Sequence, residues 1–254
     1  MRYRFFPLLA VLLAVSSAVQ AQPLRLTTQQ QPPYNMEDAK GRQSGLALET
    51  VVCALKRMQY PYSIQFLPWL RAQNMVKNGQ ADGFFPASQN AERDRFAILS
   101  ETVAPQQWRW YLPADSTVDP TSADFRSQST VGAYLGSNMQ SWLKQTGYSI
   151  YAVPYTHDQL LRVLLAGRVQ AVLASDLAMQ EAIAKAGAEQ RVRSVLQQDK
   201  PMGVYFSLQF LAGASPDFLT RFNTEVTTCR QADAPAKAAS SRPKHSEKSP
   251  AGKI

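Results

Sequence analysis

Short strand-like runs alternate with helix-like runs along most of this chain, and this alternation constrains the fold more than any other feature. Strand patterns are found at 24–28, 62–67, 82–85, 108–112, 130–134, 148–153, 170–174 and 204–210. Helical patterns are found at 45–58, 70–78, 138–145, 156–166, 177–186 and 216–230. Such alternation predicts an α/β protein with parallel sheets covered by helices on both faces. A polar stretch, residues 114–128, separates two series and predicts two lobes with a cleft between them.

The composition is that of a folded protein with a substantial apolar core. Hydrophobic residues make up 45% of the 254 positions and charged residues 18%, which is too little charge for a disordered chain. The net charge of +8 is concentrated at the ends, because segments 1–21 and 231–254 hold seven of the 27 basic residues and two of the 19 acidic ones. Bulk charge therefore gives no reason to expect a nucleic-acid partner.

The first 21 residues have the features of a secretion signal. Arg2 and Arg4 precede an apolar segment, residues 5–15, and Val19-Gln20-Ala21 places small residues at the positions that signal peptidase requires. We expect cleavage after Ala21 and export of a mature protein; an uncleaved membrane anchor is the alternative. No cysteine follows the cleavage site, so no lipid attachment is expected.

Two cysteines, Cys53 and Cys229, remain in the exported product. Export permits a disulfide between them. The residues alone leave two separately buried thiols as an equal alternative. The last 24 residues, 231–254, contain Pro, Ser, Lys and Ala without apolar periodicity, which predicts a disordered basic tail.

An ordered series of short motifs resembles the family 3 bacterial extracellular solute-binding proteins, the periplasmic receptors of amino-acid-type ABC importers. In the first half these motifs are Pro32-Pro33-Tyr34, Gly45-Leu46-Ala47-Leu48-Glu49, Pro68-Trp69-Leu70-Arg71, Gly79-Gln80-Ala81-Asp82-Gly83, Ala91-Glu92-Arg93 and Ser100-Glu101-Thr102. In the second half they are Thr130-Val131-Gly132, Leu135-Gly136-Ser137 and the segment 164–172. The resemblance spans about 24–228, nearly all of the expected mature core.

This resemblance implies the type II periplasmic binding protein fold, with a ligand cleft between two lobes. Residues 22–112 and 204–230 would form lobe 1, and residues 113–203 would form lobe 2. The chain would cross between the lobes at Leu112-Pro113 and at Met202-Gly203, where hinge motion closes the cleft on a solute. The last helix returns to lobe 1 in this family, so the resemblance favours a Cys53–Cys229 disulfide.

Arg93 matches the family's arginine that binds the α-carboxylate of the ligand. A guanidinium group suits that role because its planar fork makes two parallel charge-assisted hydrogen bonds to a carboxylate. The alternative is an ordinary surface charge beside Glu92, Asp94 and Arg95.

Four further residues of the first lobe are candidates, each with a structural alternative. Trp69 matches an aromatic position that packs against the ligand, although a core tryptophan is the alternative. Ser88 matches a hydroxyl beside the carboxylate or is a turn residue. Tyr34 lines the mouth of the cleft or packs at a strand end, and Arg71 is a second anion contact or a salt-bridge partner on its helix.

In the second lobe, Gly136, Ser137 and Asn138 lie at a predicted helix start, where free N–H groups attract anions. Simple N-capping by Ser or Asn is compatible with that role. One departure from the family concerns the aspartate that holds the ligand's α-ammonium. Here Ser175 occupies its position and Asp176 follows. Asp176 either substitutes for it or caps the next helix, so an α-amino acid ligand is in doubt while a carboxylate-bearing solute is expected.

The sequence favours a binding protein over an enzyme. It has no Cys/His metal spacing, no Gly-x-Ser-x-Gly elbow and no phosphate-binding loop, so no metal or cofactor is expected. His157 is expected at the surface near a helix cap. A dehydratase known on the same fold is a remote alternative that would need an acid or base such as Asp176 or Glu101. We expect a monomeric transport receptor with an ABC permease as its partner. A stand-alone periplasmic sensor is the other alternative.

Overall fold

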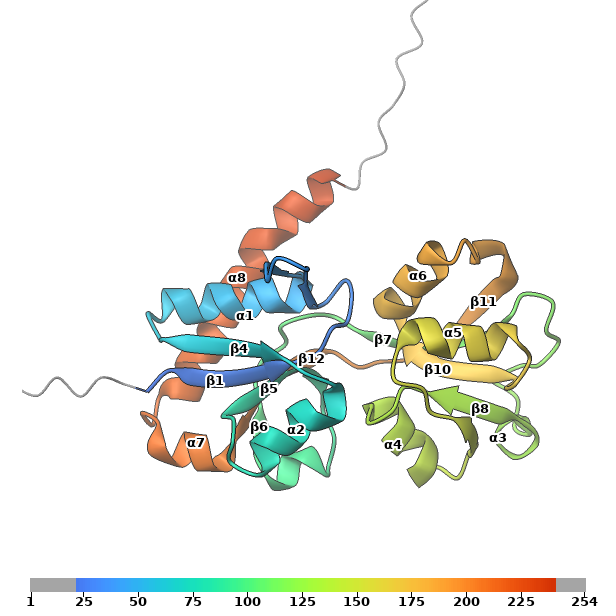
Figure 1. Ribbon diagram of the computed structural model, residues 1–254, viewed down its shortest axis with the longest axis horizontal. Helices are drawn as coiled ribbons and strands as arrows, with labels where there is room; N and C mark the ends of the chain where they lie inside the picture. Colours follow the sequence, from blue (N-terminus) through green and yellow to red (C-terminus); the bar gives the residue numbers. More distant parts are fainter. Residues whose placement is uncertain (1–21, 241–254) are drawn as a thin grey trace, which may run out of the picture.

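The computed structural model describes residues 22–240 of the 254-residue chain. The expected signal segment, its cleavage after Ala21 and residues 241–254 lie outside this range. Within it, no helix combines the length and the apolar character that a membrane span needs. The described residues form two lobes, each built on a five-stranded sheet (Figure 1).

Four strands of the first sheet run in one direction and one runs in the other. Its order is β4 (Tyr62–Phe66), β1 (Leu24–Thr28), β5 (Gly83–Ser88), β12 (Met202–Ser207) and β6 (Ala97–Leu99). Strands β4, β1 and β5 are parallel, whereas β12 is antiparallel to both of its neighbours. The elements around this sheet are α1 (Leu46–Arg57), α2 (Trp69–Lys77), α7 (Leu208–Gly213), α8 (Phe218–Ser240) and the short 3-10 helix Arg93–Arg95. A small hairpin of β2 (Met36–Glu37) and β3 (Gln43–Ser44) precedes α1.

The second sheet repeats this plan. Its order is β11 (Val192–Asp199), β7 (Gln107–Pro113), β10 (Ala171–Ser175), β8 (Thr130–Ala133) and β9 (Ser149–Ala152). Strands β10, β8 and β9 are parallel, and β7 is antiparallel to both of its neighbours, β10 and β11. Helices α5 (His157–Leu165) and α6 (Asp176–Lys185) pack into one apolar cluster, and α3 (Phe125–Gln128) and α4 (Asn138–Gln145) into another, so both faces are covered. A 3-10 helix, Glu189–Arg191, leads into β11.

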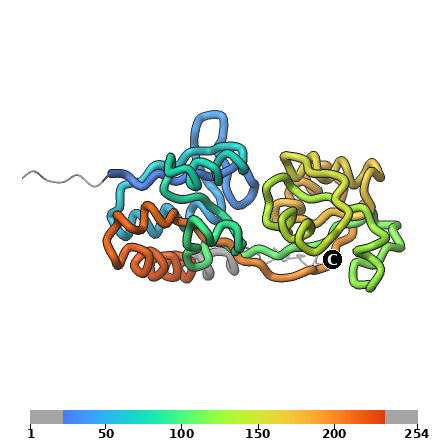
Figure 2. Tube along the Cα trace, turned by 90° about the horizontal axis from the view of Figure 1, so that it is seen from below, coloured from blue at the N-terminus to red at the C-terminus, as the bar shows by residue number. Residues whose placement is uncertain are grey.

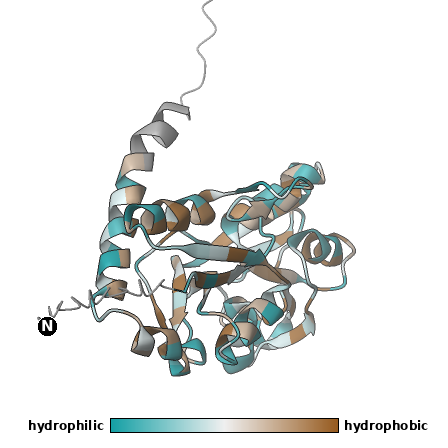
Figure 3. Ribbon diagram, turned by 60° about the vertical axis from the view of Figure 1, so that its left-hand side comes forward, coloured by the Kyte–Doolittle hydropathy of each residue, from teal (hydrophilic) through white to brown (hydrophobic). Residues whose placement is uncertain are grey.

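Apolar periodicity accounts for how these helices face their sheets. In α1, Leu48, Val51 and Leu55 are buried in the core of the first lobe, and Val52 is partly buried beside them. Figure 3 shows hydrophobic and hydrophilic residues alternating along the helices and strands. In the second lobe the predicted cap at Thr156 is confirmed, because its side chain accepts a hydrogen bond from the Gln159 amide at 3.1 Å. The predicted two-lobed α/β fold is therefore confirmed.

The points where the chain crosses between the lobes differ from the expected ones. Strand β7 pairs with β10 and β11 of the second sheet, so residues 107–112 do not belong to the first lobe. Likewise β12 pairs with β5 and β6, so Met202 and Gly203 belong to the first. The crossings lie at about 104–106 and 200–201, where Ala104 bridges Met202 and the Lys200 amide donates to the Gln106 carbonyl at 2.8 Å. Figure 2 shows the two segments passing side by side between the lobes.

Some strand boundaries also differ from those expected. Strand β5 continues through Pro86 instead of ending there. Proline has no N–H to donate to a neighbouring strand, so it is tolerated where strand pairing is irregular. The pairing of β12 with β5 has such an irregularity between Gly203 and Tyr205. The expected strand 204–210 ends at Ser207, whose hydroxyl accepts from the Phe210 amide at 3.0 Å and starts α7. Strands β6 and β11 were not expected, because neither shows a clean period-two pattern.

The expected boundary of the disordered tail at residue 231 is wrong for its first ten residues. Helix α8 continues to Ser240, well beyond the part that packs on α1 (Figure 1). This extension, residues 231–240, contains five alanines, and alanine has the highest intrinsic helix propensity.

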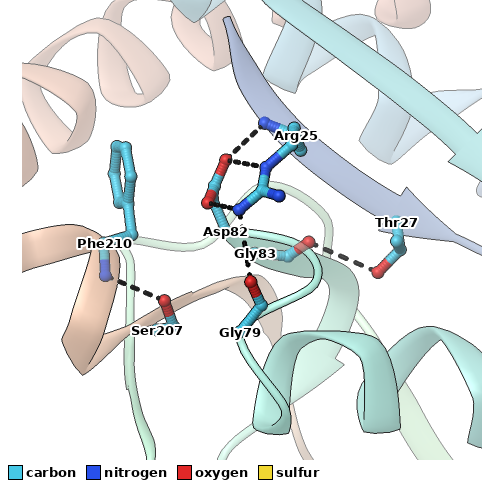
Figure 4. A network of polar contacts seen from close by, with 7 residues as sticks. All are labelled: Arg25, Thr27, Gly79, Asp82, Gly83, Ser207 and Phe210. Atoms are coloured by element: carbon cyan, nitrogen blue, oxygen red, sulfur yellow. Dashed lines mark hydrogen bonds and ion pairs between the residues drawn. The ribbon is translucent and has the colours of Figure 1, made fainter. Parts of the chain in front are cut away.

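The Gly79–Gly83 motif has a structural role at the start of the first sheet. Asp82 accepts hydrogen bonds from the Arg25 backbone amide at 2.8 Å and from its guanidinium at 2.7 and 3.0 Å (Figure 4). The Asp82 carbonyl also accepts from the Ser207 amide at 2.8 Å. These contacts tie together β1 and the segments adjoining β5 and β12, so this motif orders the strands and does not contact the cleft.

Cys53 of α1 and Cys229 of α8 form the disulfide that the resemblance favours. Their Cα atoms are 6.1 Å apart, within the range that the bond requires. The bond joins positions 176 residues apart and fastens the last helix to the first. The alternative of two separate thiols is thereby excluded.

Candidate ligand-binding site

A cavity lies between the lobes, at the carboxyl ends of the parallel strands of both sheets. This is where open α/β sheets place their ligands, because the loops that follow parallel strands meet there. Its lining comprises Gln29, Gln31, Trp69, Pro86, Ala87, Ser88, Arg93, Gln106, Tyr134, Ser137, Asn138, Met139, His157 and Met202. Five predicted ligand residues are among them: Trp69, Ser88, Arg93, Ser137 and Asn138.

Arg93 is the central charged group of this cavity. It begins the 3-10 helix after β5 and is only 5% exposed. Its guanidinium donates to Gln73 Oε1 at 2.9 Å, to the Ser88 carbonyl at 3.0 Å and, at 3.5 Å, to the Gly136 carbonyl across the cleft. The expectation of an inward-facing arginine is therefore met, and a role as an ordinary surface charge is excluded.

The charge on Arg93 is not neutralised by the protein. None of the ion pairs formed by residues 22–240 includes it. Burial lowers the pKa of Arg93 to about 10, against the weaker opposing effects of Tyr205, Glu92 and Asp94. Burying an unpaired charge is costly, so the site gains stability when an anion enters.

Trp69 and Ser88 flank the arginine from the first lobe. Trp69 starts α2 after β4, and the guanidinium carbon of Arg93 lies 5.5 Å from its ring centroid, within the range of a cation–π contact. The Trp69 ring also meets Phe84 edge-on, with 5.6 Å between centroids. Trp69 therefore lines the cavity and also packs in the core of the first lobe. Ser88 contributes its carbonyl to Arg93 and its hydroxyl to the second lobe.

The start of α4 forms the opposing wall. Ser137 caps this helix by accepting from the Gln140 amide at 3.0 Å. Gly136, with φ of +71°, precedes it in the left-handed conformation that glycine adopts readily. Its amide already donates to Gln140 Oε1 at 2.8 Å, and Gly136 does not line the cavity. The expectation that its amide faces an anion is therefore wrong; its carbonyl instead contacts Arg93.

Asn138 holds the two lobes together. Its Nδ2 donates to Ser88 Oγ at 3.0 Å and to the Gln89 carbonyl at 2.6 Å, and its Oδ1 accepts from Asn90 Nδ2 at 2.8 Å. Three hydrogen bonds thus span the cleft through one side chain. We refer to these contacts of Asn138 as the latch.

Replacing Asn138 by alanine is expected to shift the unliganded protein toward an open arrangement. A buried hydrogen bond contributes about 1 kcal/mol, so loss of the latch favours opening by a factor of ten or more. Small-angle X-ray scattering should show a larger radius of gyration for Asn138→Ala than for the wild type. Identical scattering profiles would show that the latch does not hold the cleft closed.

Three predicted residues lie behind the cavity and do not line it. Tyr34 is fully buried and donates from its hydroxyl to Asp176 Oδ1 at 3.0 Å. Burial raises the pKa of Tyr34 well above its usual range, so the hydroxyl remains a donor. Asp176 Oδ1 also accepts a hydrogen bond from the backbone N–H of Gln107 at 3.1 Å. Ser175 Oγ donates to the Tyr34 hydroxyl at 3.4 Å. These side chains contact one another across the lobes and, contrary to the expectation, do not line the cavity in this structure.

Arg71 is exposed on α2, on a surface groove with Leu70 and Gln80, and does not line the cavity. The helical period explains this, because Trp69 and Ala72 occupy the buried face of α2 and leave Arg71 facing away. None of the ion pairs formed by residues 22–240 includes Arg71, so the alternative of a salt-bridge partner is not found either.

His157, expected at the surface, is the residue whose position differs most from its prediction. It begins α5 after β9, stacks on Tyr134 with 5.3 Å between ring centroids, and lines the cavity. Its Nε2 is buried without a hydrogen-bond partner, and burial lowers the pKa of His157 to about 4, so the ring is neutral. The sequence contained a signal that could have identified His157 as a cavity residue. His157 lies at a helix start after strand β9, just as Asn138 lies at a helix start after strand β8.

Three glutamines and Tyr134 were also missed. Gln29 and Gln31 follow β1, and Gln106 lies in a crossing between the lobes. The Tyr134 hydroxyl donates to Gln29 Oε1 across the cleft, and burial raises the pKa of Tyr134 to about 12. All but Gln106 follow the carboxyl ends of strands, which is the signal that could have identified them.

The free space left in this arrangement is small. The cavity has about 30 Å³ open to the centre of a water-sized sphere. That is room for one or two water molecules, so a solute of several heavy atoms requires the lobes to part or the side chains to move.

No acidic side chain of the described residues lines the cavity. Within residues 22–240 there is also no group of three or more His, Cys, Asp or Glu that could hold a metal ion. The chemistry of the lining is one arginine, one neutral histidine, and amide, hydroxyl and aromatic groups.

Two sheets with this strand order, joined by two crossings around a cavity, define the type II periplasmic binding protein fold. No protein-family profile matches the sequence, and no curated protein matches it significantly. Solved structures do match. A histidine kinase sensor domain similar to periplasmic binding proteins gives a TM-score of 0.73 at 16% identity, covering 86% of this chain and 95% of that one.

Two amino-acid-binding proteins match nearly as well. The arginine-, lysine-, histidine-binding protein ArtJ of Geobacillus stearothermophilus gives a TM-score of 0.70 at 14% identity, covering 88% of this chain and 97% of that one. The GluR0 ligand-binding core of Nostoc punctiforme, solved with L-glutamate, gives 0.69 at 14% identity, with coverage of 85% and 96%. The resemblance to family 3 solute-binding proteins thus holds at the level of the fold.

Proposed function

We propose that this protein is an exported solute-binding protein that captures a small carboxylate-bearing solute between its lobes and delivers it to an ABC importer. The observation that carries the proposal is Arg93, a buried guanidinium without a counter-ion among the described residues, in a cavity between two hinged lobes. A carboxylate would neutralise this charge with two parallel hydrogen bonds. Export to the periplasm follows from the predicted signal segment, which lies outside the described residues.

Closure of the two lobes would complete the capture of the solute. In the open state a solute would reach Arg93, Trp69 and Ser88 on the first lobe. Movement about residues 104–106 and 200–201 would then bring Ser137, Asn138 and His157 onto it from the second lobe. Because the latch joins the lobes directly, its hydrogen bonds would reinforce the closed state that holds the solute.

The test is a binding screen of the mature protein against small carboxylates and amino acids by thermal shift, followed by calorimetry. A ligand at one hundred times its Kd stabilises the folded state by about 2.7 kcal/mol, which corresponds to an increase in Tm of about 5–10 °C for a chain of this size. Neutral amide or alcohol analogues of a hit should give no shift. An absence of binding by every carboxylate, with binding of sugars or cations instead, would refute the proposal.

A stand-alone periplasmic sensor is the second candidate, because a histidine kinase sensor domain gives the highest of the three TM-scores above. The two candidates differ in the step after binding. Deletion of the gene should abolish uptake of the identified solute if the protein serves an importer, and should leave uptake intact if it serves as a sensor.

The two carboxyl groups named for the dehydratase alternative do not line the cavity. Asp176 is engaged by Tyr34 and Gln107 behind the cavity, and Glu101 is exposed at the end of the first lobe's sheet. Since no acid of residues 22–240 lines the cavity, a carboxyl group of this part of the chain is not positioned to act on a bound molecule.

A further inference from the structure

The free polar groups of the cavity are predominantly hydrogen-bond donors, and this restricts the chemistry of the solute. The side-chain oxygens of the three glutamines are already used. Gln29 Oε1 accepts from the Tyr134 hydroxyl, Gln31 Oε1 accepts from Gln29 Nε2 at 2.7 Å, and Gln106 Oε1 accepts from Trp108 Nε1 at 3.0 Å.

The same arrangement fixes the orientation of the amide groups and leaves two donors free. With their oxygens pointing at donors, Gln31 and Gln106 present Nε2 groups that have no acceptor among the described residues. Both residues are 6% exposed and line the cavity, so these groups can donate to a bound solute. Arg93 adds further N–H groups and is the one positively charged residue among those that line the cavity.

The remaining hydrogen-bonding oxygens are also engaged within the protein. Ser88 Oγ and Asn138 Oδ1 accept across the latch, and Ser137 Oγ accepts from the Gln140 amide. An ammonium group needs several acceptors and, when buried, a nearby negative charge. Each of these side-chain oxygens already accepts one hydrogen bond, no described residue that lines the cavity carries a negative charge, and Arg93 would repel such a group.

Among the described residues that line the cavity, His157 has the one side-chain atom that is both buried and without a hydrogen-bond partner. Its Nε2 is buried and unpartnered, and the neutral ring can donate or accept at that atom according to its tautomer. An orphaned buried nitrogen is costly, and a hydroxyl or carbonyl oxygen of a bound solute would satisfy it.

Building on the proposed function, we infer that the solute is a carboxylate whose second polar group is an uncharged oxygen, a hydroxyl or a carbonyl, and not an ammonium. Arg93 binds the carboxylate, and His157 Nε2 forms a hydrogen bond to the second oxygen from the opposite lobe. The class comprises 2-hydroxy and 2-oxo acids in place of the corresponding amino acids.

The experiment compares acids that share a carbon skeleton and differ in one substituent. Calorimetry would use alanine, lactate and pyruvate; leucine and its 2-hydroxy and 2-oxo counterparts; phenylalanine with phenyllactate and phenylpyruvate; and glutamate with 2-hydroxyglutarate and 2-oxoglutarate. In any set that binds, the hydroxy or oxo acid should bind at least tenfold more tightly than the amino acid. Amino acids that bind equally well or better would overturn this inference while leaving the proposed function intact. Binding by no acid of any set would reject this inference for these acids, and the proposed function would then be decided by the wider carboxylate screen described above.

Two variants test the role of His157. His157→Ala should weaken binding of the preferred hydroxy or oxo acid by at least tenfold, whereas His157→Gln, which keeps a hydrogen-bonding nitrogen, should recover part of it. Arg71→Ala, on the outer surface of α2, serves as the matched control and should bind like the wild type. Circular dichroism would establish that each variant is folded. Unchanged affinity in folded His157→Ala would remove His157 from the site.

Discussion

Replacing Arg93 by alanine is expected to reduce affinity for the carboxylate solute by tenfold to a hundredfold. Hydrogen bonds to charged groups contribute about 1.5 to 3 kcal/mol, and each 1.4 kcal/mol is a factor of ten in Kd. Arg93→Lys should recover only part of this loss, because an ammonium keeps the charge and lacks the planar fork that binds two oxygens at once. Isothermal titration calorimetry on the mature protein would measure all three affinities.

Two controls separate a binding role for Arg93 from a structural one. Arg71→Ala removes the same side chain from an exposed position and should leave affinity unchanged. The Tm of unliganded Arg93→Ala should stay within a few degrees of the wild type, because the lost hydrogen bonds to neutral oxygens are offset by removal of an unpaired buried charge. Unaltered affinity in Arg93→Ala would defeat the assignment.

Removing the disulfide is expected to have the largest effect on stability. The bond closes a loop across positions 176 residues apart, and loss of such a bond costs about 3 to 5 kcal/mol in the chain-entropy account. For a chain of this size the Tm of the Cys53→Ser, Cys229→Ser double variant should fall by about 10 °C or more. Thermal unfolding followed by circular dichroism would measure this difference.

A reducing agent provides the matched control for the disulfide. Dithiothreitol should lower the Tm of the wild type toward that of the double variant and should leave the double variant unchanged. Affinity for the solute should be retained well below the Tm, because the bond joins α1 to α8 and neither cysteine lines the cavity. A Tm within about 2 °C of the wild type would show that the packing of α1 on α8 suffices without it.

The two lobes and most of their elements could be predicted from the sequence, because local periodicity reports which face of each element is buried. The stripe of Leu48, Val51 and Leu55 specified α1, and Thr156 with Gln159 specified the start of α5. Local periodicity does not show which sheet a strand joins. The alternation in 107–113 is equally compatible with either sheet, and only pairing with β10 and β11 decided for the second.

The candidate site also contains residues that the sequence could identify and residues whose roles depend on long-range contacts. Arg93, Trp69 and Ser88 could be proposed because their residue types and order resemble a known ligand pattern, and the structure brings them to one cavity. Asp176 and Ser175 were drawn into the same pattern by proximity in sequence, yet their partner is Tyr34, 142 and 141 residues away. A long-range hydrogen bond of this kind leaves no local trace in the sequence.

The sequence by itself therefore determined most of the helices and strands, the division into two lobes and the residue types capable of binding an anion. Only the tertiary structure decided which polar atoms remain free once the lobes meet. The latch through Asn138, the engaged glutamine oxygens and the buried Nε2 of His157 all depend on contacts between segments far apart in the chain. The physical reason is that a residue's burial follows from its own element, whereas hydrogen-bond satisfaction depends on every element packed against it.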